Sequence, residues 1–524
     1  MNVIRIADMQ DIDRLAVHRY KIPSLLLMEH AGYGMFTQFK HHFPKRCSVT
    51  VISGTGNNGG DGLVLARNLS AHGYHVTVIV CGDRGRCTAD FKTNFDMVET
   101  SGVTVVEVPH ERAVVKSVGR IKNTDVIVDA LFGTGLNRPP AGTAKKLIAA
   151  MNASDAKRVS LDIPSGLPSV KDGGICVHAD RTYTVGLPKD IFFRAPYCAY
   201  IGLLSVVPSI FPSELLNRGT VQMLDAAALS TVRIPENRFG DKRSAVVGLV
   251  AGSARYPGAA VMAAAAMYRL GAGYIHLVVP GAIRGLVQKK LPPEIVVTGI
   301  GDRNTDYFTG AHVPSVADVL SNAGAVCIGC GIGREKETGV FFEAVLPKLP
   351  RRTLIDADGL YFLSGQPPLL QKIKCDVIIT PHIFEYARIT GLTPDAIREN
   401  PEASLMAYKH KGTAHIVLKD AITFVRASSS LFIHNHPADG MGKAGMGDVL
   451  AGIITALWAR GFSAEDAMKL GVYLHGASFR QVRRKRGAAA VMPTDVGEAV
   501  GTMYARFFSA YKHKKIESIR KRSV

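Results

Sequence analysis

Gly54-Thr-Gly-Asn-Asn-Gly-Gly-Asp-Gly62 stands between a short run rich in β-branched residues, residues 47–53, and a helical segment, residues 63–72. The run predicts a strand, and Gly73 follows the helix where glycine commonly ends one. A strand, a glycine-rich loop and a helix in this order bind phosphate groups in many α/β domains. The stretch therefore predicts an α/β fold with a ligand site at the loop.

Gly54, Gly56 and Gly59 of this loop satisfy the GxGxxG fingerprint of dinucleotide-binding domains. Asp83 lies at the end of the next predicted strand, at roughly the spacing of a ribose-binding acid. One open interpretation is therefore an NAD-dependent dehydrogenase, which would transfer hydride to a second substrate.

Asn57, Asn58 and Asp61 crowd the same loop with polar side chains. We expect Asp61 to lie in the first turn of the helix, where it caps the backbone but repels a pyrophosphate. The need for a tight turn explains the glycines but not two asparagines and an aspartate together. This composition favours a site with a chemistry of its own over a plain dinucleotide loop.

Strands and helices are predicted to alternate through both halves of the chain. Further strands in the first half are predicted at residues 75–80, 103–108, 126–131 and 159–163. Pro208, Pro212 and Gly219 interrupt the pattern, which then restarts. In the second half, helices are predicted at residues 259–270 and 449–459, and strands at 245–251, 275–279, 326–328, 353–355, 377–380 and 415–418. Alternation of this kind predicts parallel α/β sheets, here in two domains, 1–220 and 221–524.

The composition limits the function classes. Hydrophobic residues make up 47% of the 524 residues and charged residues 20%, which is enough apolar material for folded cores. The net charge of +19 is concentrated in part in residues 480–486 and 512–522, which we interpret as solvated surface and a tail, so no nucleic-acid partner is predicted. No apolar run reaches the about 18 residues of a membrane span. We expect a cytoplasmic homo-oligomer that acts on small molecules.

Cysteine and histidine patterns are interpreted as structural. Eight cysteines fit a reducing compartment rather than a disulfide scaffold. Cys327-Ile-Gly-Cys330 has redox spacing, but it continues an apolar run and is interpreted as a buried strand end. His41-His42 and His434-Asn-His436 are interpreted as surface or loop residues, because no acidic or cysteine partner has zinc-site spacing.

Polar groups follow two more predicted strands of the first half. Asp129 begins the segment Asp-Ala-Leu-Phe-Gly-Thr-Gly-Leu, and Asp162 begins Asp-Ile-Pro-Ser165-Gly-Leu. Ligands of doubly wound sheets bind at the carboxyl ends of strands. Carboxylate, amide and hydroxyl oxygens there suit an alkali or alkaline-earth cation better than zinc.

These three motifs resemble the epimerase domain of the NAD(P)H-hydrate repair enzymes over about residues 1–215, as does the opening segment 22–32. The resemblance implies a Rossmann-like fold and interconversion of the R and S forms of hydrated NADH or NADPH. It implies a potassium ion held by Asn58, Asp129 and Ser165, and it places Asp162 against the reacting ring. The residues implied to bind the hydrated cofactor are Asn57, Asn58, Gly59, Gly60, Asp61, Gly133, Thr134, Gly135, Leu136 and Asp162.

The implied chemistry agrees with the residue types. Inverting a carbinol carbon beside a ring nitrogen requires loss and return of the hydroxyl through an iminium ion. A carboxylate can stabilise this cation and carry the proton. We therefore predict that Asp162 is the catalytic residue.

A second glycine-rich loop, residues 439–448, reads Asp-Gly-Met-Gly-Lys-Ala-Gly-Met-Gly-Asp and precedes an apolar helix. Backbone N–H groups at a helix N-terminus form an anion site. Asp448 at its end can act as base for a hydroxyl that attacks a phosphoryl group. The Walker pattern is absent, because Ala444 rather than Ser or Thr follows Lys443.

Residues 225–505 resemble ribokinase-like folds, specifically the ADP-dependent dehydratase domain of the same repair family. The motifs that carry this are the second loop, Asp356-Ala-Asp-Gly, Thr380-Pro-His382 and Val417-Leu-Lys419. The resemblance implies a kinase-like reaction: Asp448 assists attack of the ring hydroxyl on the β-phosphate of ADP, and the ester eliminates to NAD(P)H, with AMP and phosphate as products. Magnesium would bridge the phosphates. Ala259, Gly331, His382 and Asp448 are implied to contact the hydrated cofactor, and Lys419, Asp420, Ala421, Ile422, Thr423 and Gly447 to contact ADP.

The second site departs from the family pattern. Met446 stands where the family has threonine, and Asp420 stands where it has glycine and puts a carboxylate near the nucleotide phosphates. An adverse unit charge at about 4 Å costs about 4 kcal/mol at an effective dielectric of about 20. Alternatives therefore stay open: an ATP-dependent small-molecule kinase fused to a nucleotide-binding domain, an epimerase with an inactive second domain, or a cofactor-binding scaffold.

Overall fold

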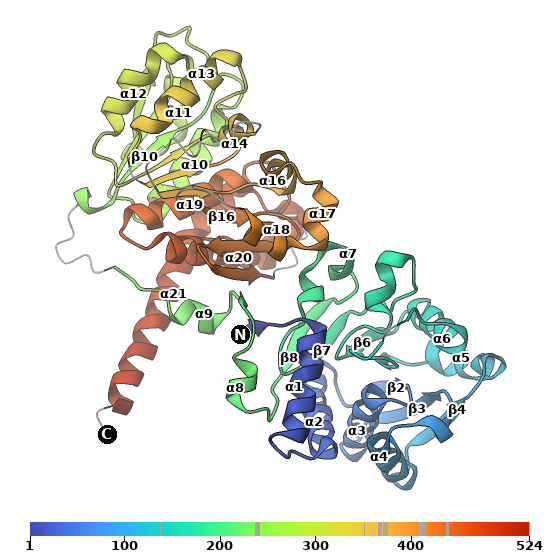
Figure 1. Cartoon of the computed structure of the whole chain (residues 1–524). Coiled ribbons are helices and arrows are strands. Elements are labelled where there is room, and N and C mark those ends of the chain that lie inside the picture. The colour runs from blue at the N-terminus through green and yellow to red at the C-terminus, as the bar shows by residue number, and fades with distance from the viewer. Residues whose placement is uncertain are drawn as a thin grey trace. The chain divides into compact units, whose positions relative to one another are not determined.

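The computed structural model describes residues 1–136, 138–235, 242–350, 352–364, 369, 376–408, 414–435 and 440–522. The chain divides into two compact units, one of residues 2–220 and the other of Met1 with residues 221–524 (Figure 1). Each unit is built on its own sheet. We describe the two units one after the other.

The N-terminal unit contains a seven-stranded sheet in the order β4-β3-β2-β5-β6-β7-β8, and all its neighbouring strands are parallel. Its strands are β2 (Ser48–Ser53), β3 (His75–Cys81), β4 (Thr104–Val108), β5 (Val126–Ala130), β6 (Lys157–Leu161), β7 (Arg181–Val185) and β8 (Leu203–Val207). Within this sheet β2 is the first strand in the sequence. The chain then adds β3 and β4 on one side of β2 and β5 to β8 on the other side. The doubly wound α/β fold is confirmed, with β7 and β8 as additional strands.

Helices cover both faces of this sheet (Figure 1). One apolar core holds Phe36, Phe39 and Phe91, and the other holds Leu147 and Met151. The longer helices are α1 (Ile6–His18), α2 (Ser24–His42), α3 (Asn57–Ala71), α4 (Ala89–Thr100), α5 (Val114–Lys122) and α6 (Gly142–Asn152). Because both faces are covered, residues 49–53 of β2 and all of β5 are buried, including the polar Thr50 and Asp129.

Helix α3 starts at Asn57, six residues before the predicted start at residue 63. The glycines pack inside its first turns: a Cβ on Gly59 would lie 1.9 Å from the Gly54 carbonyl oxygen, and one on Gly60 would lie 2.4 Å from the Met28 sulfur. The prediction that Asp61 caps the helix is wrong, because the N-cap is Gly56 and has no side-chain cap. Asp61 is the fifth helical residue, and its side chain faces a pocket instead.

The sheet of the C-terminal unit runs in the order β9-β18-β17-β16-β15-β14-β13-β10-β11-β12. The strands are β9 (Val221–Met223), β10 (Val246–Val250), β11 (Tyr274–Pro280), β12 (Val296–Ile300), β13 (Ala325–Ile328), β14 (Arg352–Ile355), β15 (Asp376–Ile379), β16 (Ala414–Leu418), β17 (Thr423–Ala427) and β18 (Ser430–His434). Strands β10 to β16 pair in parallel, whereas β16, β17 and β18 form an antiparallel meander. The meander is missing from the sequence prediction.

A large apolar core lies between this sheet and the helices α10 (Pro257–Arg269), α19 (Met446–Ala459), α20 (Ala464–Arg486) and α21 (Pro493–Arg522). Helix α19 is buried around its whole circumference as far as Ala459, as its almost purely apolar sequence requires. Gly452 permits its close approach to α10, because a Cβ there would lie 2.4 Å from the Ala263 carbonyl oxygen.

The other helices of the unit are shorter. They are α9 (Ala226–Ser230), α11 (Arg284–Lys290), α12 (Val313–Leu320), α13 (Lys336–Val345), α14 (Asp358–Leu363), α16 (Ile383–Thr390), α17 (Pro394–Glu399) and α18 (Pro401–Ala407). Two of them, α16 and α17, contribute residues to the site described below.

The structural interpretation of the cysteine motif is confirmed, whereas that of the histidines holds only in part. Cys327 and Cys330 are fully buried at the end of β13. His42 lies at the end of α2 and bonds the Tyr183 hydroxyl at 3.0 Å. His434 was predicted to be exposed, and this is wrong: it ends β18 and is buried. His436 and Asp439 lie outside the described residues.

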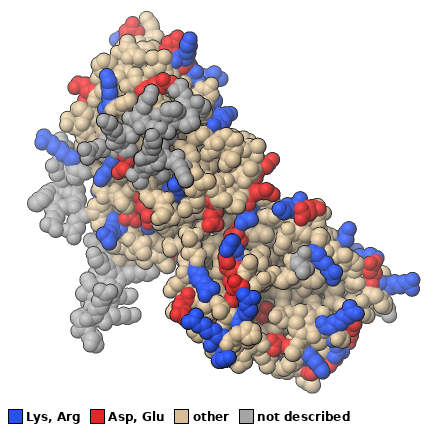
Figure 2. Space-filling model, in the orientation of Figure 1, with Lys and Arg blue, Asp and Glu red and all other residues tan. Residues whose placement is uncertain are grey.

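The charged surface is mixed. Basic and acidic side chains intermingle over the face shown in Figure 2. The basic run at residues 480–486 forms the end of α20, where Arg480 is partly buried, and the side chains of the run at 512–522 are not among those described. Among the described residues, no helix combines the length and apolar character that crossing a membrane requires.

Candidate active sites

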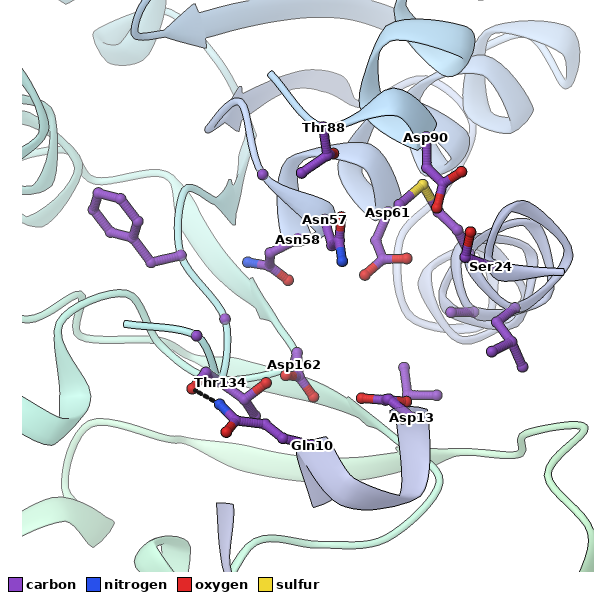
Figure 3. A pocket seen from close by; sticks show the side chains of 18 of the residues that line it. Gln10, Asp13, Ser24, Asn57, Asn58, Asp61, Thr88, Asp90, Thr134 and Asp162 are labelled. Carbon is purple, nitrogen blue, oxygen red and sulfur yellow. Dashed lines mark hydrogen bonds between the residues drawn. The ribbon is translucent and has the colours of Figure 1, made fainter. Parts of the chain in front are cut away.

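The N-terminal unit has a pocket of about 830 Å³ at the carboxyl ends of β2, β5 and β6 (Figure 3). Three loops form one side of it, and helices α1, α2 and α3 supply the rest. This volume suits a ligand the size of a nucleotide or a large part of a dinucleotide. The position is the one expected for a ligand in a doubly wound sheet.

Most of the residues predicted to bind the hydrated cofactor in the first unit line this pocket. They are Asn57, Asn58, Asp61, Gly133, Thr134, Gly135, Leu136 and Asp162. Gly59 and Gly60 do not line it, because they are buried within α3. Because they lack side chains, the helix packs closely at these positions. Their contact with the hydrated cofactor stays a prediction.

Gly133 brings the two polar loops together. A Cβ at this position would lie 3.3 Å from both the Asn58 side chain and an Asp162 carboxylate oxygen. The loop is also fixed from α1, because the Gln10 side chain donates a hydrogen bond of 2.7 Å to the Thr134 carbonyl oxygen (Figure 3). A larger residue at 133 would therefore displace both Asn58 and Asp162.

Asp162 is held by a lysine that sequence reasoning missed. The Lys189 ammonium lies 2.6 Å from Asp162 Oδ1 and also donates to Thr184 Oγ1 at 2.7 Å. Lys189 is only 1% exposed, so this charge pair is shielded from bulk water. The only sequence signal was a lysine beside a strand end, Gly186-Leu-Pro-Lys189, in a chain with many exposed lysines.

The backbone of Asp162 is unusual as well. Its φ angle is +60°, a left-handed conformation that aspartate and asparagine tolerate better than most side chains. The conformation follows directly after β6, where it aims the carboxylate into the pocket. Local strain of this kind is common where a side chain must be placed exactly for function.

Two further carboxyl groups face Asp162 in the pocket. Asp61 comes from α3 and Asp13 from α1 (Figure 3). Burial first, and then repulsion by Asp162, raises the pKa of Asp13 to about 6 and that of Asp61 well above its usual range. Burial therefore favours the protonated form of Asp61, which can donate a hydrogen bond to a bound ligand.

Of the predicted cation ligands, Asn58 lines the pocket, whereas Asp129 and Ser165 are not among its lining residues. Asp129 is fully buried and accepts hydrogen bonds from the Ser165 hydroxyl at 2.6 Å, the Ser165 backbone N–H at 2.8 Å and the Ser160 hydroxyl at 2.8 Å. Burial raises the pKa of this carboxyl, and its hydrogen bonds oppose the rise. Both polar atoms of the Asn58 side chain are buried and have no partner among the described residues.

The C-terminal unit builds a second site at the carboxyl ends of β13, β14, β15 and β16. Its centre is Asp356, which follows β14 and is 1% exposed. Asp356 Oδ1 accepts hydrogen bonds from Lys419 Nζ at 2.8 Å and from Thr380 Oγ1 at 2.7 Å. Neighbouring parallel strands end at the same edge of the sheet, and this brings the three side chains together.

Asp448 adds a second carboxylate from the start of α19. The side chains of Cys330, Asp356 and Asp448 each have a potential ligand atom within 4.8 Å of the others. Burial first, and then repulsion by Asp356, raises the pKa of Asp448 to about 7. A base with this pKa accepts a proton readily near neutral pH.

Ala259 and Gly331, which were predicted to contact the hydrated cofactor, lie next to each other. A Cβ on Gly331 would lie 2.8 Å from the Ala259 Cβ, so neither position has room for a larger side chain. His382 caps α16 through its Nδ1 and forms a β-bridge with Lys419. Gly447 approaches the centre closely, because a Cβ there would lie 3.3 Å from Lys419 Nζ.

Of the residues predicted to bind ADP, residues 419–423 connect β16 to β17 and enter its first position, whereas Gly447 belongs to α19. Ile422 is buried, Ala421 is exposed, and Thr423 begins β17. Asp420 is not the free carboxylate that the sequence suggested: Arg398 of α17 donates to it from Nε at 2.8 Å and from Nη2 at 3.4 Å. The pair cancels the charge that was expected to repel nucleotide phosphates. Met446 is buried in the apolar core, so its side chain fills space rather than replacing the hydroxyl of a threonine.

Comparison with known proteins assigns the chain to a family. Residues 24–191 match the YjeF-related protein N-terminus family, and residues 247–501 match the NAD(P)H-hydrate dehydratase family. The bifunctional NAD(P)H-hydrate repair enzyme of Thermofilum pendens is 32% identical over 93% of this chain and 93% of its own length. The chain belongs to the bifunctional NAD(P)H-hydrate repair enzymes. The predicted enzyme class is thereby confirmed.

A second repair enzyme, from Moorella thermoacetica, is 30% identical over 95% of both chains. Among solved structures, an ADP/ATP-dependent NAD(P)H-hydrate dehydratase from Bacillus subtilis, co-crystallised with ATP and Mg²⁺, is 21% identical with a TM-score of 0.46. It covers 55% of this chain and 99% of its own. The repair enzymes thus match this chain across both of its units.

Proposed function

We propose that the N-terminal unit interconverts the R and S forms of hydrated NADH and NADPH, and that the C-terminal unit dehydrates the S form with a nucleoside diphosphate. The observation that carries this is the presence of two separate carboxylate-centred sites, one at the carboxyl edge of each sheet. The division is chemically sensible. A dehydration step that accepts only the S epimer leaves the R epimer behind, and the epimerase must first convert that R epimer to the S form.

In the first site, Asp162 is the residue that meets the reacting carbon. Its carboxylate, which is paired with the Lys189 ammonium, can stabilise the iminium ion that forms when the hydroxyl leaves. Asp61, whose pKa is raised by burial, offers a second carboxyl group to the bound ring or its carboxamide. Asn57 and the loop 133–136 bind the remainder of the molecule.

Asn58, Asp129 and Ser165 fit a potassium ion. Asn58 offers a buried amide oxygen that lacks a donor among the described residues, and Asp129 is a buried carboxylate whose hydrogen-bond partners there are all neutral. Oxygen ligands of this kind suit a hard monovalent cation. When bound, the ion supplies positive charge beside the loops that hold the phosphates.

In the second site, Asp448 takes the proton of the ring hydroxyl as its oxygen attacks the β-phosphorus of ADP. The bond from this phosphorus to the bridging oxygen breaks, and AMP leaves. The phosphate ester then loses phosphate from the ring, together with a proton from the neighbouring carbon, to give NAD(P)H. Lys419 and the backbone N–H groups before α19 stabilise the negative charge on the phosphates.

Magnesium fits this site in part. Asp356 and Asp448 offer the carboxylate oxygens that Mg²⁺ prefers, with nucleotide phosphates as the remaining ligands, whereas the Cys330 thiol is too soft. We assign Asp356 as the residue that would hold it. When bound, the ion neutralises phosphate charge. Homo-oligomerisation and a cytoplasmic location stay predictions.

The test is recovery of reduced-nicotinamide absorbance from a mixture of both hydrate epimers, with magnesium and either ADP or ATP. We expect complete recovery with ADP. Recovery that stops at the S fraction would show that the epimerase assignment is wrong. If no absorbance is recovered but chromatography shows that the epimers still interconvert, the second unit is inactive. If neither reaction is observed, the assignment of both sites is overturned.

The Asp420–Arg398 pair predicts how the second site tolerates its unusual aspartate. Arg398→Met should raise the KM for ADP by about three- to tenfold. The Asp420 carboxylate is then unpaired and repels the ADP phosphates, and solvent screens part of this repulsion. Asp420→Gly, which restores the family residue, should change the KM less than about twofold. Initial rates at varied ADP measure both, and equal effects of the two variants would contradict the pairing argument.

A further inference from the structure

Asp13 lies in the first pocket without having been part of any motif. It comes from α1, near the start of the chain, and its carboxyl group lines the pocket with Asp162 and Asp61. In Figure 3 the carboxyl groups of Asp13 and Asp162 point toward one another from different elements. Helix α1 is fixed there by Met9, Ile12 and Ala16, which are buried in an apolar cluster.

The surroundings of the two carboxyl groups differ in one respect. Asp162 has the buried ammonium of Lys189 at 2.6 Å, whereas none of the ion pairs found in the described residues includes Asp13. Asp13 is accessible from the pocket, yet the surrounding walls and the Asp162 charge disfavour its ionised form. Two carboxyl groups whose environments differ in this way can take different acid–base roles.

Epimerisation at the carbinol carbon needs this combination. The hydroxyl leaves as water only if an acid protonates its oxygen as the carbon–oxygen bond breaks. Water must then add to the opposite face of the iminium ion, while a base takes its proton. One carboxyl group cannot reach both faces of a planar ring, so inversion requires two groups that approach from different sides.

We propose that Asp13 is a second catalytic residue of the epimerase site and shares a single proton with Asp162 across the bound ring. The proposal rests on the function proposed above. In one direction Asp13 gives its proton to the departing hydroxyl oxygen, and Asp162 accepts a proton from the entering water. In the other direction the roles are reversed, and a proton returned through water restores the starting state.

The pair also predicts a pH dependence. The charged and titratable groups that line the pocket with Asp13 come from several elements: Asp162 after β6, Lys189 after β7, Asp61 on α3, Asp90 on α4, Cys81 of β3 and Arg138 after β5, with Arg14 and His18 on its own helix. The raised pKa of about 6 means that Asp13 loses its proton as the pH rises through this value. The kcat/KM for epimerisation, which reports the free enzyme, should therefore fall on the alkaline side with an apparent pKa near 6.

The test uses the full-length enzyme, with Asp13→Asn beside Asp8→Asn as a matched control. Asp8 lies on the same helix, is not among the pocket residues, and pairs with Arg5 at the surface. Asp13→Asn should lower the kcat for epimerisation about 100-fold, with the KM changed little, and should abolish the alkaline limb. Asp8→Asn should behave as the wild type, and ADP-dependent dehydration of the pure S epimer should be unchanged in both variants.

Isotope exchange in the wild-type enzyme tests the same step without a variant. In water enriched in ¹⁸O, each epimerisation should place one solvent oxygen on the ring carbon. Retention of the original oxygen would overturn the proposal, and so would an Asp13→Asn enzyme with wild-type kcat and pH profile. Absence of epimerisation in the wild type would instead overturn the proposed function itself.

Discussion

Asp162→Asn is expected to lower the kcat for epimerisation by about 10³- to 10⁴-fold, the largest effect of any single substitution in the first unit. The amide cannot carry the proton and offers no negative charge to the iminium ion. Asparagine tolerates the left-handed backbone at this position, so the loop keeps its path. Epimer exchange followed by chromatography measures the loss.

The substitution also leaves the Lys189 ammonium buried beside a neutral amide. Removing one member of a buried charge pair typically costs about 3–5 kcal/mol of stability. Asp162→Asn with Lys189→Met removes both charges and should recover most of the thermal stability without recovering epimerisation. If the double variant regained activity, the loss in the single variant would be one of folding rather than of chemistry.

Asp83→Asn is the matched control for this experiment. Asp83 caps a short turn after β3, is largely exposed and is not among the residues of the pocket. The dehydrogenase interpretation makes it the ribose-binding acid, in which case its loss would weaken binding of the cofactor. The repair interpretation predicts no change in epimerisation. A substantial rise in KM would favour the dehydrogenase geometry.

The second large effect is expected at Asp448. Asp448→Asn should lower the kcat for dehydration of the S epimer by about 10²- to 10⁴-fold, because the ring hydroxyl loses its base. Asparagine has the shape of the protonated acid, and the raised pKa of about 7 shows that the site accommodates a neutral group. Folding and ADP binding should therefore persist, and absorbance recovery with pure S epimer measures the loss.

Asp318→Asn on the exposed side of α12 provides a control in the same unit. Epimerisation should be unaffected in both variants, since its residues all belong to residues 2–220. A mixture of epimers incubated with the Asp448→Asn enzyme should reach epimer equilibrium without gaining absorbance. If dehydration continued at the wild-type rate, another base would have to be sought around Asp356.

The sequence predicted best where function depends on a contiguous loop. Asn57, Asn58 and Asp61 lie in the first turns of α3, and Asp162 and Ser165 lie in the loop after β6, so local chain geometry fixes each set. The carboxyl ends of parallel strands then meet at one edge, which made the joining of the loops predictable from strand order alone. The same logic located Asp356, Thr380 and Lys419 around one centre.

The sequence did not predict contacts between side chains that come from different helices and strands. Lys189 lies 27 residues beyond Asp162 but touches it, Asp13 reaches the pocket from the first long helix, and Arg398 neutralises Asp420 from α17. Nothing in the local sequence distinguishes these residues from solvated charges. The meander β16-β17-β18 was missed for a similar reason, since antiparallel pairing depends on partners rather than on a run of residues.

By itself the sequence determined the α/β class, the glycine loops and the repair family, because short motifs encode local backbone geometry and family membership. Only the tertiary structure decided which charges are paired, which carboxyl groups have raised pKa values and which glycines pack against neighbouring elements. Protonation and pairing depend on burial and on distances of a few ångströms between elements remote in the chain, and these quantities exist only once the chain has folded.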